Sequence, residues 1–267
     1  MAPYKSGIDL RRDTQLYTAN PFTNDYPSGS FKVRADLLPL VRGILLPNYQ
    51  ILEREKELFA RIERDYRGED PLFVPILKGA VRFSQDMFRF SRQIDPEYEF
   101  MPASSYGTRL ESGEVRLNLA EITRLLEKLE DRHRPVIIVE DIVDTGNTLS
   151  HIVSVLNSID EVVDSQPELQ SFQRRGRYQP SSVRICTMLN KPDRRKEENK
   201  DLPVDYVGFT IPDLWVFGYG MDVWNDRSRT IDHLCVINEE WEDPSKLAEF
   251  FSEIDSKRKK KRTKKQD

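Results

Sequence analysis

Cysteine and histidine are scarce in this sequence, which has two and three of them among 267 residues. Cys186 and Cys235 both lie inside apolar, strand-like runs, so we expect buried hydrophobic side chains rather than a disulfide or a ligand pair. The histidines, His133, His151 and His233, are scattered and show no metal-ligand spacing. The sequence therefore argues against a zinc site.

Long hydrophobic runs are missing as well. The chain has no stretch of about 18 apolar residues, the length that a membrane-spanning helix needs. Its beginning, Met1-Ala-Pro-Tyr-Lys-Ser6, lacks the apolar core of a signal peptide, so we expect a cytoplasmic protein. At 267 residues, the chain can bury a full core, and its length fits one enlarged α/β domain better than two domains. Its 38% hydrophobic and 32% charged residues predict a soluble, rather polar protein.

Charge is distributed unevenly between the C-terminal end and the rest of the chain. Residues 257–265 carry eight positive charges and Asp267 one negative charge, whereas the whole chain has a formal net charge of −4 and the part before residue 257 has −11. Such a basic run could bind RNA or anionic membrane, or serve as a nuclear address. Because no aromatic residues are interleaved with the charges, we expect instead a disordered, solubilising tail over 257–267.

The most informative segment is a predicted strand that leads through a short loop into a helix. Val136 to Val139 are four β-favouring apolar residues, and Glu140 and Asp141 follow directly. The loop 144–148 consists of small and polar residues, and a helical pattern of apolar residues begins at Leu149. A loop between a strand and a helix N-terminus presents free backbone N–H groups to a phosphate.

The loop and the two carboxylates favour different parts of one ligand. Gly146 allows the main chain to approach a phosphate closely, and Thr145 and Thr148 add hydroxyl donors. Glu140 and Asp141 would repel a bare anion. They suit a ligand with vicinal hydroxyls or a bound Mg²⁺ beside its phosphate, as in a phosphorylated ribose. The alternative is an ordinary strand end with solvated acids and a helix N-cap.

Two further predicted strands end on a lysine. The strand at 72–77 runs into Lys78 and Gly79, which offer a cation and an accessible backbone N–H to a diphosphate. Taken alone, a lysine in this place is more often a surface charge. The strand at 183–190 ends on Lys191, and an aromatic and glycine-rich segment follows further along the chain.

Together and in this order, these segments resemble the hypoxanthine-guanine phosphoribosyltransferases, which are type I phosphoribosyltransferases. The resemblance covers roughly residues 44–238. It rests on the segments Lys78-Gly79, Ala103-Ser-Ser-Tyr-Gly107, Val136–Leu149, Asn190-Lys-Pro192, Val207–Asp213 and Trp215–Asp222. Three of these sequences look more like the bacterial branch of the family than the animal one: Ala103-Ser-Ser-Tyr-Gly107, Thr145-Gly-Asn-Thr-Leu149 and Asn190-Lys-Pro192.

The resemblance implies an α/β type I phosphoribosyltransferase fold, with a mostly parallel central sheet flanked by helices and a small hood region. The alternation of predicted strands with helices, at about 47–67 and 82–91, favours the same sheet and places ligands at its carboxyl edge. We expect the domain to span 44–256, with an insertion at about 160–182 and an N-terminal extension at 1–43.

The resemblance also implies site residues and binding of 5-phosphoribosyl-1-pyrophosphate (PRPP), a purine base and Mg²⁺, with Asp144 as general base or proton acceptor toward the purine. The residues expected at the phosphoribosyl group are Glu140, Asp141, Asp144, Thr145, Gly146, Asn147 and Thr148. Those expected at the pyrophosphate are Lys78, Gly79, Ser105, Tyr106 and Arg229. Those expected at the purine are Lys191, Trp215 and Val216, and those at the metal are Glu140, Asp141 and Asp222.

The sequence departs from the family pattern in two places. The segment after Asp222 is one residue longer than the usual spacing, so Arg227 competes with Arg229 for the pyrophosphate. Asn147 replaces the lysine of the animal branch, which reduces the cationic help given to the phosphate. The resemblance further implies a cis peptide between Leu77 and Lys78.

The implied reaction moves the 5-phosphoribosyl group of PRPP to N9 of hypoxanthine or guanine and releases pyrophosphate. Ser105 and Tyr106 would begin a loop that closes over the site and keeps water from the cationic ribose. A xanthine-preferring transferase is one alternative. A PRPP-sensing regulator that binds nucleic acid through the basic tail is another. The family also implies a homo-oligomer, a dimer or a tetramer.

Overall fold

The computed structural model describes residues 8–12, 14–20, 30–102, 108–109, 115–116, 119–130 and 132–263. The chain divides into two compact units, which differs from the single enlarged domain that its length favours. The first unit comprises residues 1–12 and 52–213, and the second comprises residues 13–51 and 214–267. Within the described ranges, no helix is both long and apolar enough to cross a membrane.

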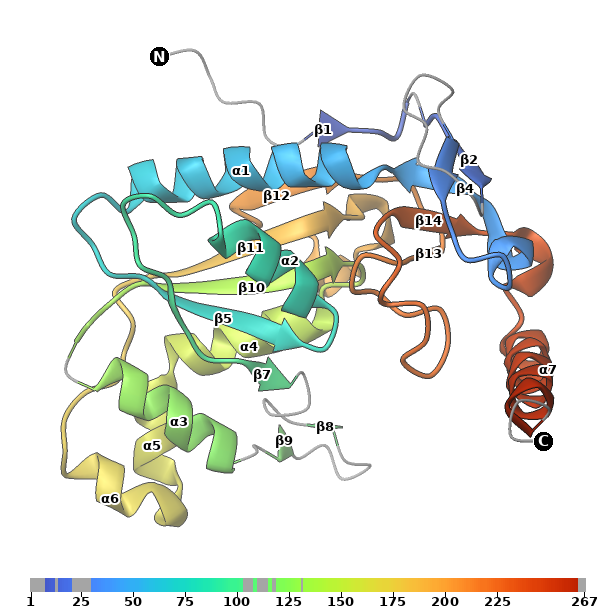
Figure 1. Ribbon diagram of the computed structural model, residues 1–267. Coiled ribbons are helices and arrows are strands. Elements are labelled where there is room, and N and C mark those ends of the chain that lie inside the picture. Colours follow the sequence, from blue (N-terminus) through green and yellow to red (C-terminus); the bar gives the residue numbers. More distant parts are fainter. Residues whose placement is uncertain are drawn as a thin grey trace. The chain divides into compact units, whose positions relative to one another are not determined.

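The first unit is built on a parallel sheet in the order β1-β12-β11-β10-β5-β6, with β7 also paired to β5 (Figure 1). Its strands are β1 (Ile8–Asp9), β5 (Leu72–Leu77), β6 (Glu97–Tyr98), β7 (Met101–Pro102), β10 (Val136–Val143), β11 (Val183–Asn190) and β12 (Tyr206–Thr210). A separate antiparallel pair consists of β8 (Thr108–Arg109) and β9 (Val115–Arg116). The predicted, mostly parallel sheet is therefore confirmed.

Helices cover both faces of this sheet. The α-helices described up to residue 213 are α1 (Asn48–Asp65), α2 (Ala80–Phe88), α3 (Leu119–Leu129), α4 (Asn147–Asn157), α5 (Ile159–Ser165) and α6 (Gln170–Gln173), of which α5 and α6 pack beside each other after α4. On one face, the Phe73 ring of β5 lies 5.9 Å from Phe59 of α1 and 4.9 Å from Phe88 of α2. On the other face, Ile138 of β10 shares a buried cluster with Ile152 of α4. Burial on both faces explains why the central strands read as continuous apolar runs.

The observed elements lie close to their predicted positions. The strand predicted at 72–77 is β5, and the apolar run from Val136 begins β10, which continues to Val143. The helix predicted at 47–67 is α1, while that predicted at 82–91 is α2, which begins and ends earlier. Both cysteines are free and buried, as predicted.

The second unit contains a three-stranded antiparallel sheet, β13-β14-β4, and a parallel pair, β2-β3. The strands are β2 (Thr18–Asn20), β3 (Ser30–Lys32), β4 (Val41–Leu46), β13 (Val216–Phe217) and β14 (Leu234–Ile237). Phe31 and Leu40, from the segment expected to be an extension, are buried in one cluster with Phe217 and Phe251. Part of that segment therefore belongs to the core of this unit.

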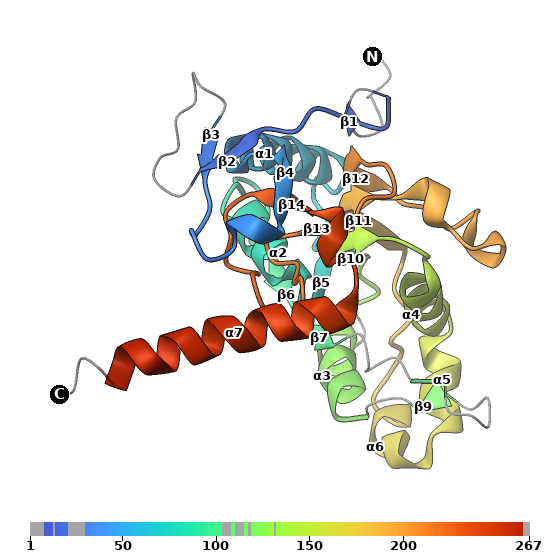
Figure 2. The same cartoon turned by 90° about the vertical axis from the view of Figure 1, so that its right-hand side faces the viewer.

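The end of the second unit is helix α7 (Pro244–Thr263), a single continuous helix in Figure 2. Residues 257–263 are helical, which differs from the disordered tail that their charge predicts. Lys and Arg are good helix formers, and the preceding turns of α7 are already held by packing, so adding residues needs no new nucleus. Lys257 Nζ also lies 3.3 Å from Glu253 Oε2, one turn earlier.

Candidate active site

The carboxyl ends of β5, β10 and β11 lie at one edge because these strands are parallel neighbours. Gly79 follows β5 and is packed against Asp141 near the end of β10. A Cβ atom on Gly79 would lie 1.6 Å from Asp141 Oδ2, a distance that no pair of non-bonded atoms adopts. The structure thus brings the expected diphosphate segment against the expected ribose carboxylates, and the contact requires glycine at position 79.

Glu140 and Asp141 form a half-buried pair of adjacent carboxylates. The backbone N–H of Ile142 donates to Asp141 Oδ1 over 2.8 Å, which fixes that side chain. Burial, together with the neighbouring Asp141 carboxylate, raises the pKa of Glu140 well above its usual range. Two ionised carboxylates are therefore unfavourable here until a cation or several hydrogen-bond donors approach them. Their oxygen donors fit ribose hydroxyls and a hard cation such as Mg²⁺.

The expected phosphate loop ends at the N-terminus of α4. Gly146, which precedes the helix, has φ of +82°, in the left-handed region that favours glycine. The first turn of α4 contains Asn147 and Thr148, both exposed, and its backbone N–H groups have no partners within the helix. Loop and helix therefore combine N–H groups, hydroxyl groups and the positive end of a helix dipole, as the sequence predicts for an anion site.

Asn199, which the sequence analysis missed, holds this loop from outside. Its Nδ2 group donates to the Thr145 carbonyl over 3.1 Å and to Asn147 Oδ1 over 2.7 Å. Its own Oδ1 accepts from Ser150 Oγ over 2.6 Å. Asn199 ends the short 3₁₀ helix η5 (Glu197–Asn199) and is buried, although it lies in a charged stretch without apolar periodicity.

Arg195 is a second residue that the sequence analysis missed. Its Nη1 atom would lie 3.4 Å from a Cβ on Gly146, and its Nη2 donates to Asn190 Oδ1 over 2.7 Å. Among the residues that the structure describes, no hydrogen-bond partner is found for its buried Nε. Burial lowers the pKa of the Arg195 guanidinium. A half-buried cation with a spare donor thus lies beside the loop that contains Gly146 and Asn147.

The predicted purine residue Lys191 lies next to the predicted proton acceptor. Lys191 is 6% exposed, and its Nζ is 3.9 Å from Asp144 Oδ2 and 3.8 Å from Asp213 Oδ1. Burial lowers its pKa, and the two carboxylates oppose that shift. Arg194, in η4 (Pro192–Arg194), contacts the same two carboxylates at 3.0 Å and 3.4 Å. The motif after β11 predicted Lys191 but neither Arg194 nor Asp213.

Comparison with known proteins identifies the family. Residues 42–162 match the model of the phosphoribosyl transferase domain. The hypoxanthine-guanine phosphoribosyltransferase of Mycobacterium tuberculosis is 36% identical over 206 residues, which are 74% of this chain and 87% of the relative. The chain belongs to the hypoxanthine-guanine phosphoribosyltransferase family. The hypoxanthine phosphoribosyltransferase of Salmonella typhimurium is 35% identical over 67% of this chain and 86% of its own length.

Solved structures of the family have the same fold. A hypoxanthine phosphoribosyltransferase from Staphylococcus aureus is 30% identical and matches with a TM-score of 0.56, covering 78% of this chain and 99% of its own. A hypoxanthine-guanine phosphoribosyltransferase from Bacillus anthracis matches with a TM-score of 0.53 at 30% identity, over 74% of this chain and 98% of its own. The type I phosphoribosyltransferase fold expected from the sequence is thus confirmed.

The remaining residues suggested by the family motifs lie in several places. The peptide between Leu77 and Lys78 is cis, as predicted, and the Lys78 side chain is exposed. Trp215 is partly buried against the core of the second unit, and Val216 lies in β13, paired with β14. Ser105 and Tyr106 lie outside the described residues.

Within the second unit, the two arginines that compete for the pyrophosphate have different partners. Arg229 Nη2 lies 2.8 Å from Asp222 Oδ1, the expected metal ligand. Arg227 forms a two-pronged ion pair with Asp255 of α7, at 3.0 Å and 2.6 Å. Arg229 therefore contacts Asp222, whereas Arg227 is paired with α7. Of the two arginines, Arg229 is the better candidate for binding the pyrophosphate.

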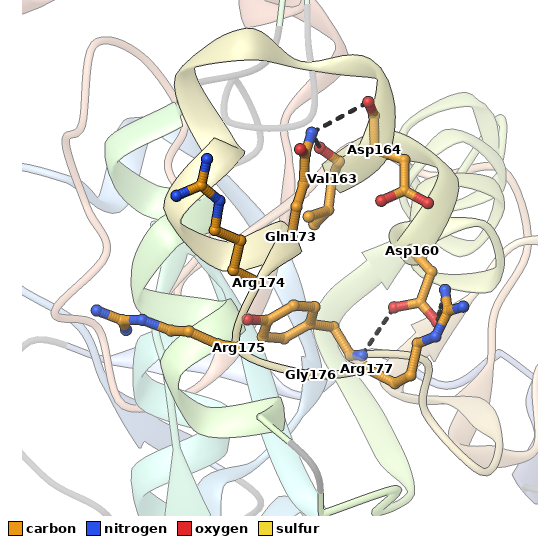
Figure 3. A pocket seen from close by; sticks show the side chains of 9 residues that line it. Asp160, Val163, Asp164, Gln173, Arg174, Arg175, Gly176 and Arg177 are labelled. Carbon is orange, nitrogen blue, oxygen red and sulfur yellow. Dashed lines mark hydrogen bonds and ion pairs between the residues drawn. The ribbon is translucent and has the colours of Figure 1, made fainter.

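A surface hollow of about 350 Å³ lies in the segment expected to be an insertion, between α5 and residues 173–178 (Figure 3). Asp160 accepts the backbone N–H of Tyr178 over 2.7 Å, and its Oδ2 lies 3.8 Å from Arg177 Nη1. The acids of α5 thus offset part of the arginine charge. The hollow is made by elements that follow α4, not by the carboxyl ends of the strands, and we do not assign it to the active site.

Proposed function

We propose that this protein transfers the 5-phosphoribosyl group of PRPP to N9 of hypoxanthine or guanine, giving IMP or GMP and pyrophosphate. The observation that carries the proposal is the convergence at one sheet edge of an acidic pair, a phosphate loop and a buried lysine beside Asp144. Membership of the hypoxanthine-guanine phosphoribosyltransferase family supports the same activity in purine salvage.

The loop at 144–148 would bind the 5′-phosphate through the N–H groups of α4 and the hydroxyls of Thr145 and Thr148. Arg195 would add the positive charge that Asn147 lacks. Glu140 and Asp141 would accept hydrogen bonds from the ribose hydroxyls. These contacts fix the ribose so that C1′ faces the purine, and positioning of this kind supplies much of the rate of a transfer without a covalent enzyme intermediate.

Mg²⁺ fits the same acidic edge. Glu140 and Asp141 would hold it, directly or through water, because adjacent carboxylates that resist joint ionisation are stabilised by a cation. Asp222 would be a ligand for a second ion. When bound with PRPP, the metal would offset charge on the diphosphate leaving group. Lys78, the Gly79 N–H and Arg229 would do the same from the protein side.

In the transfer, the bond between C1′ and the pyrophosphate oxygen breaks and the bond between C1′ and N9 forms. Lys191 would donate to the 6-oxo group of the base, and Trp215 would stack on the purine ring. Adenine presents a 6-amino group there, so a largely buried ammonium would be left poorly paired. As N9 bonds to ribose, the purine N–H becomes more acidic, and Asp144 would accept its hydrogen bond or its proton.

Parallel assays with hypoxanthine, guanine, xanthine and adenine test the proposal, each in the presence of PRPP and Mg²⁺. We expect nucleotide formation with hypoxanthine and guanine and none with adenine. A clear preference for xanthine would replace the proposed substrate by the alternative one. PRPP binding without turnover of any base would overturn the enzyme assignment and favour a regulator. A homo-oligomer and a cytoplasmic location stay predictions.

A further inference from the structure

A loop of the second unit is fastened to the C-terminal helix. Arg227 lies in the loop 222–229, and its guanidinium meets both carboxylate oxygens of Asp255, on α7, at 3.0 Å and 2.6 Å. The same guanidinium lies 5.0 Å from the centre of the Phe251 ring, one turn earlier on α7. Two-pronged pairing with additional stacking is the geometry in which arginine holds another segment most specifically.

The loop itself has an unusual backbone. Asn225, Asp226 and Ser228 have φ of +44°, +63° and +69°, although none of them is glycine. A residue with a side chain adopts such a φ at a cost in free energy, so the surroundings must hold it in place. The backbone N–H of Arg227 donates to the Trp224 carbonyl over 2.9 Å. The side chain of Arg227 then ties this tight turn to a helix outside it.

The loop also contains the two residues for which we propose contacts with metal and pyrophosphate. Arg229 Nη2 donates to Asp222 Oδ1 over 2.8 Å and to Asp226 Oδ1 over 3.0 Å. Its Nη1 donates to the Gly220 carbonyl over 2.6 Å. The position of Arg229 therefore depends on the same strained turn that Arg227 fastens to α7.

We propose that the Arg227–Asp255 pair is a positioning device, through which helix α7 orders the loop 222–229 and so tunes the binding of pyrophosphate and PRPP. The inference rests on the proposed function, since it needs Asp222 and Arg229 at the diphosphate.

A purely structural role in holding α7 is not the better explanation. The helix is anchored by buried apolar residues, among them Leu247 and Ile254, in the core of the second unit. It has a further ion pair, from Arg258 Nη2 to Asp36 Oδ2 at 2.8 Å, which does not involve the loop. The pair of Arg258 with Asp36 is therefore a matched control for the pair of Arg227 with Asp255.

The test compares Asp255→Asn with Arg258→Gln in the full-length protein. Each variant loses one partly exposed ion pair of α7, so similar small changes in melting temperature are expected. For Asp255→Asn we expect the KM for PRPP and the inhibition constant of pyrophosphate to rise about two- to fivefold, with the KM for hypoxanthine unchanged. Arg258→Gln should leave all three constants unchanged. Equal constants for the two variants would overturn the inference.

Two further variants separate this inference from the proposed function. Arg227→Gln should reproduce Asp255→Asn, and the double variant should be no worse than either single one, because both remove the same interaction. Arg229→Gln tests the premise that Arg229 binds the diphosphate. It should weaken the binding of pyrophosphate more than Arg227→Gln or Asp255→Asn does. Normal pyrophosphate inhibition in Arg229→Gln would overturn the diphosphate assignment itself. Weak inhibition there, with normal inhibition in Asp255→Asn, would overturn only the role of α7.

Discussion

The side-chain amide of Asn199 donates to Asn147 Oδ1 over 2.7 Å and so joins a buried residue of η5 to the first residue of α4. Since Asn147 Oδ1 is occupied as an acceptor, its NH₂ group is the part that can donate to a phosphate. The same Asn199 amide holds the Thr145 carbonyl. A residue 52 positions after Asn147 thus sets the shape of the proposed phosphate loop.

Substitution of Asn199 by Ala should therefore weaken PRPP binding. Three hydrogen bonds are lost at a buried position, and we expect the KM for PRPP to rise on the order of tenfold, with some loss of stability. Steady-state kinetics with varied PRPP would measure the effect. Asn157→Ala, at the exposed far end of α4, is the control and should leave the KM for PRPP unchanged. An unchanged KM in Asn199→Ala would show that the loop keeps its shape without the amide.

Gly79 offers a steric test of the acidic edge. In Gly79→Ala the new methyl group would collide with the Asp141 carboxylate, so the carboxylate or the β5 end must move. We expect kcat/KM for PRPP to fall by at least about tenfold, since small displacements of positioning groups are costly. Gly68→Ala is a useful comparison, because its Cβ would meet nothing, although its φ of +81° makes it costly for stability. Full activity in Gly79→Ala would show that the Asp141 carboxylate need not stay where it is.

The parts of this structure that the sequence predicts are those with strong local patterns. β5 is a nearly continuous apolar run and α1 has a clear helical period, so both were predicted close to their observed bounds. The start of β10 was predicted from its apolar residues 136–139, whereas the strand continues through Glu140 and Asp141 to Val143. Lys191 and Gly146 were predicted because a strand end and a glycine loop are visible within a few residues of sequence. The contact of Gly79 with Asp141 could be anticipated only from the parallel pairing of β5 and β10, which places the carboxyl ends of the two strands at the same edge of the sheet.

The parts that the sequence did not predict depend on contacts between distant segments. Asn199 and Arg195 lie in a charged stretch, and only the folded chain places them beside residues 145–147. The early residue Phe31 enters the core of the second unit through contacts with late residues, so local periodicity does not reveal it. The helical course of α7 after residue 257 depends on the packed turns before it, whereas composition alone suggested disorder.

Asp144 should control turnover more than PRPP affinity. If it accepts the purine proton or hydrogen bond, Asp144→Asn should lower kcat by roughly 10²- to 10⁴-fold and change the KM for PRPP much less. Asp213→Asn is the matched control, because Asp213 contacts the same Lys191 and Arg194 without the proposed role in proton transfer. It should alter mainly the KM for the base. Equal losses of kcat in both variants would assign the effect to the cluster of charges instead of to Asp144.

The buried ammonium of Lys191 predicts a pH dependence for base binding. Burial lowers its pKa below the usual 10.5, so the lysine loses its proton at a lower pH than an exposed one does. The charge is present below this lowered pKa and is lost as the pH rises through it. The KM for hypoxanthine should therefore rise with pH on the alkaline side, while this group leaves the KM for PRPP unchanged. Lys191→Arg keeps its charge throughout and provides the reference.

The KM for hypoxanthine is measured for the native protein and for Lys191→Arg between about pH 7 and about pH 10. Ionisation of hypoxanthine itself affects both proteins equally, so a difference between them reports the titration of Lys191. The ratio of the hypoxanthine KM of the native protein to that of Lys191→Arg should climb with pH. In Asp213→Asn the rise of this ratio should occur at a lower pH, since the substitution removes a carboxylate that favours the charged lysine. A ratio that stays constant over the range would mean that the Lys191 charge does not recognise the 6-oxo group.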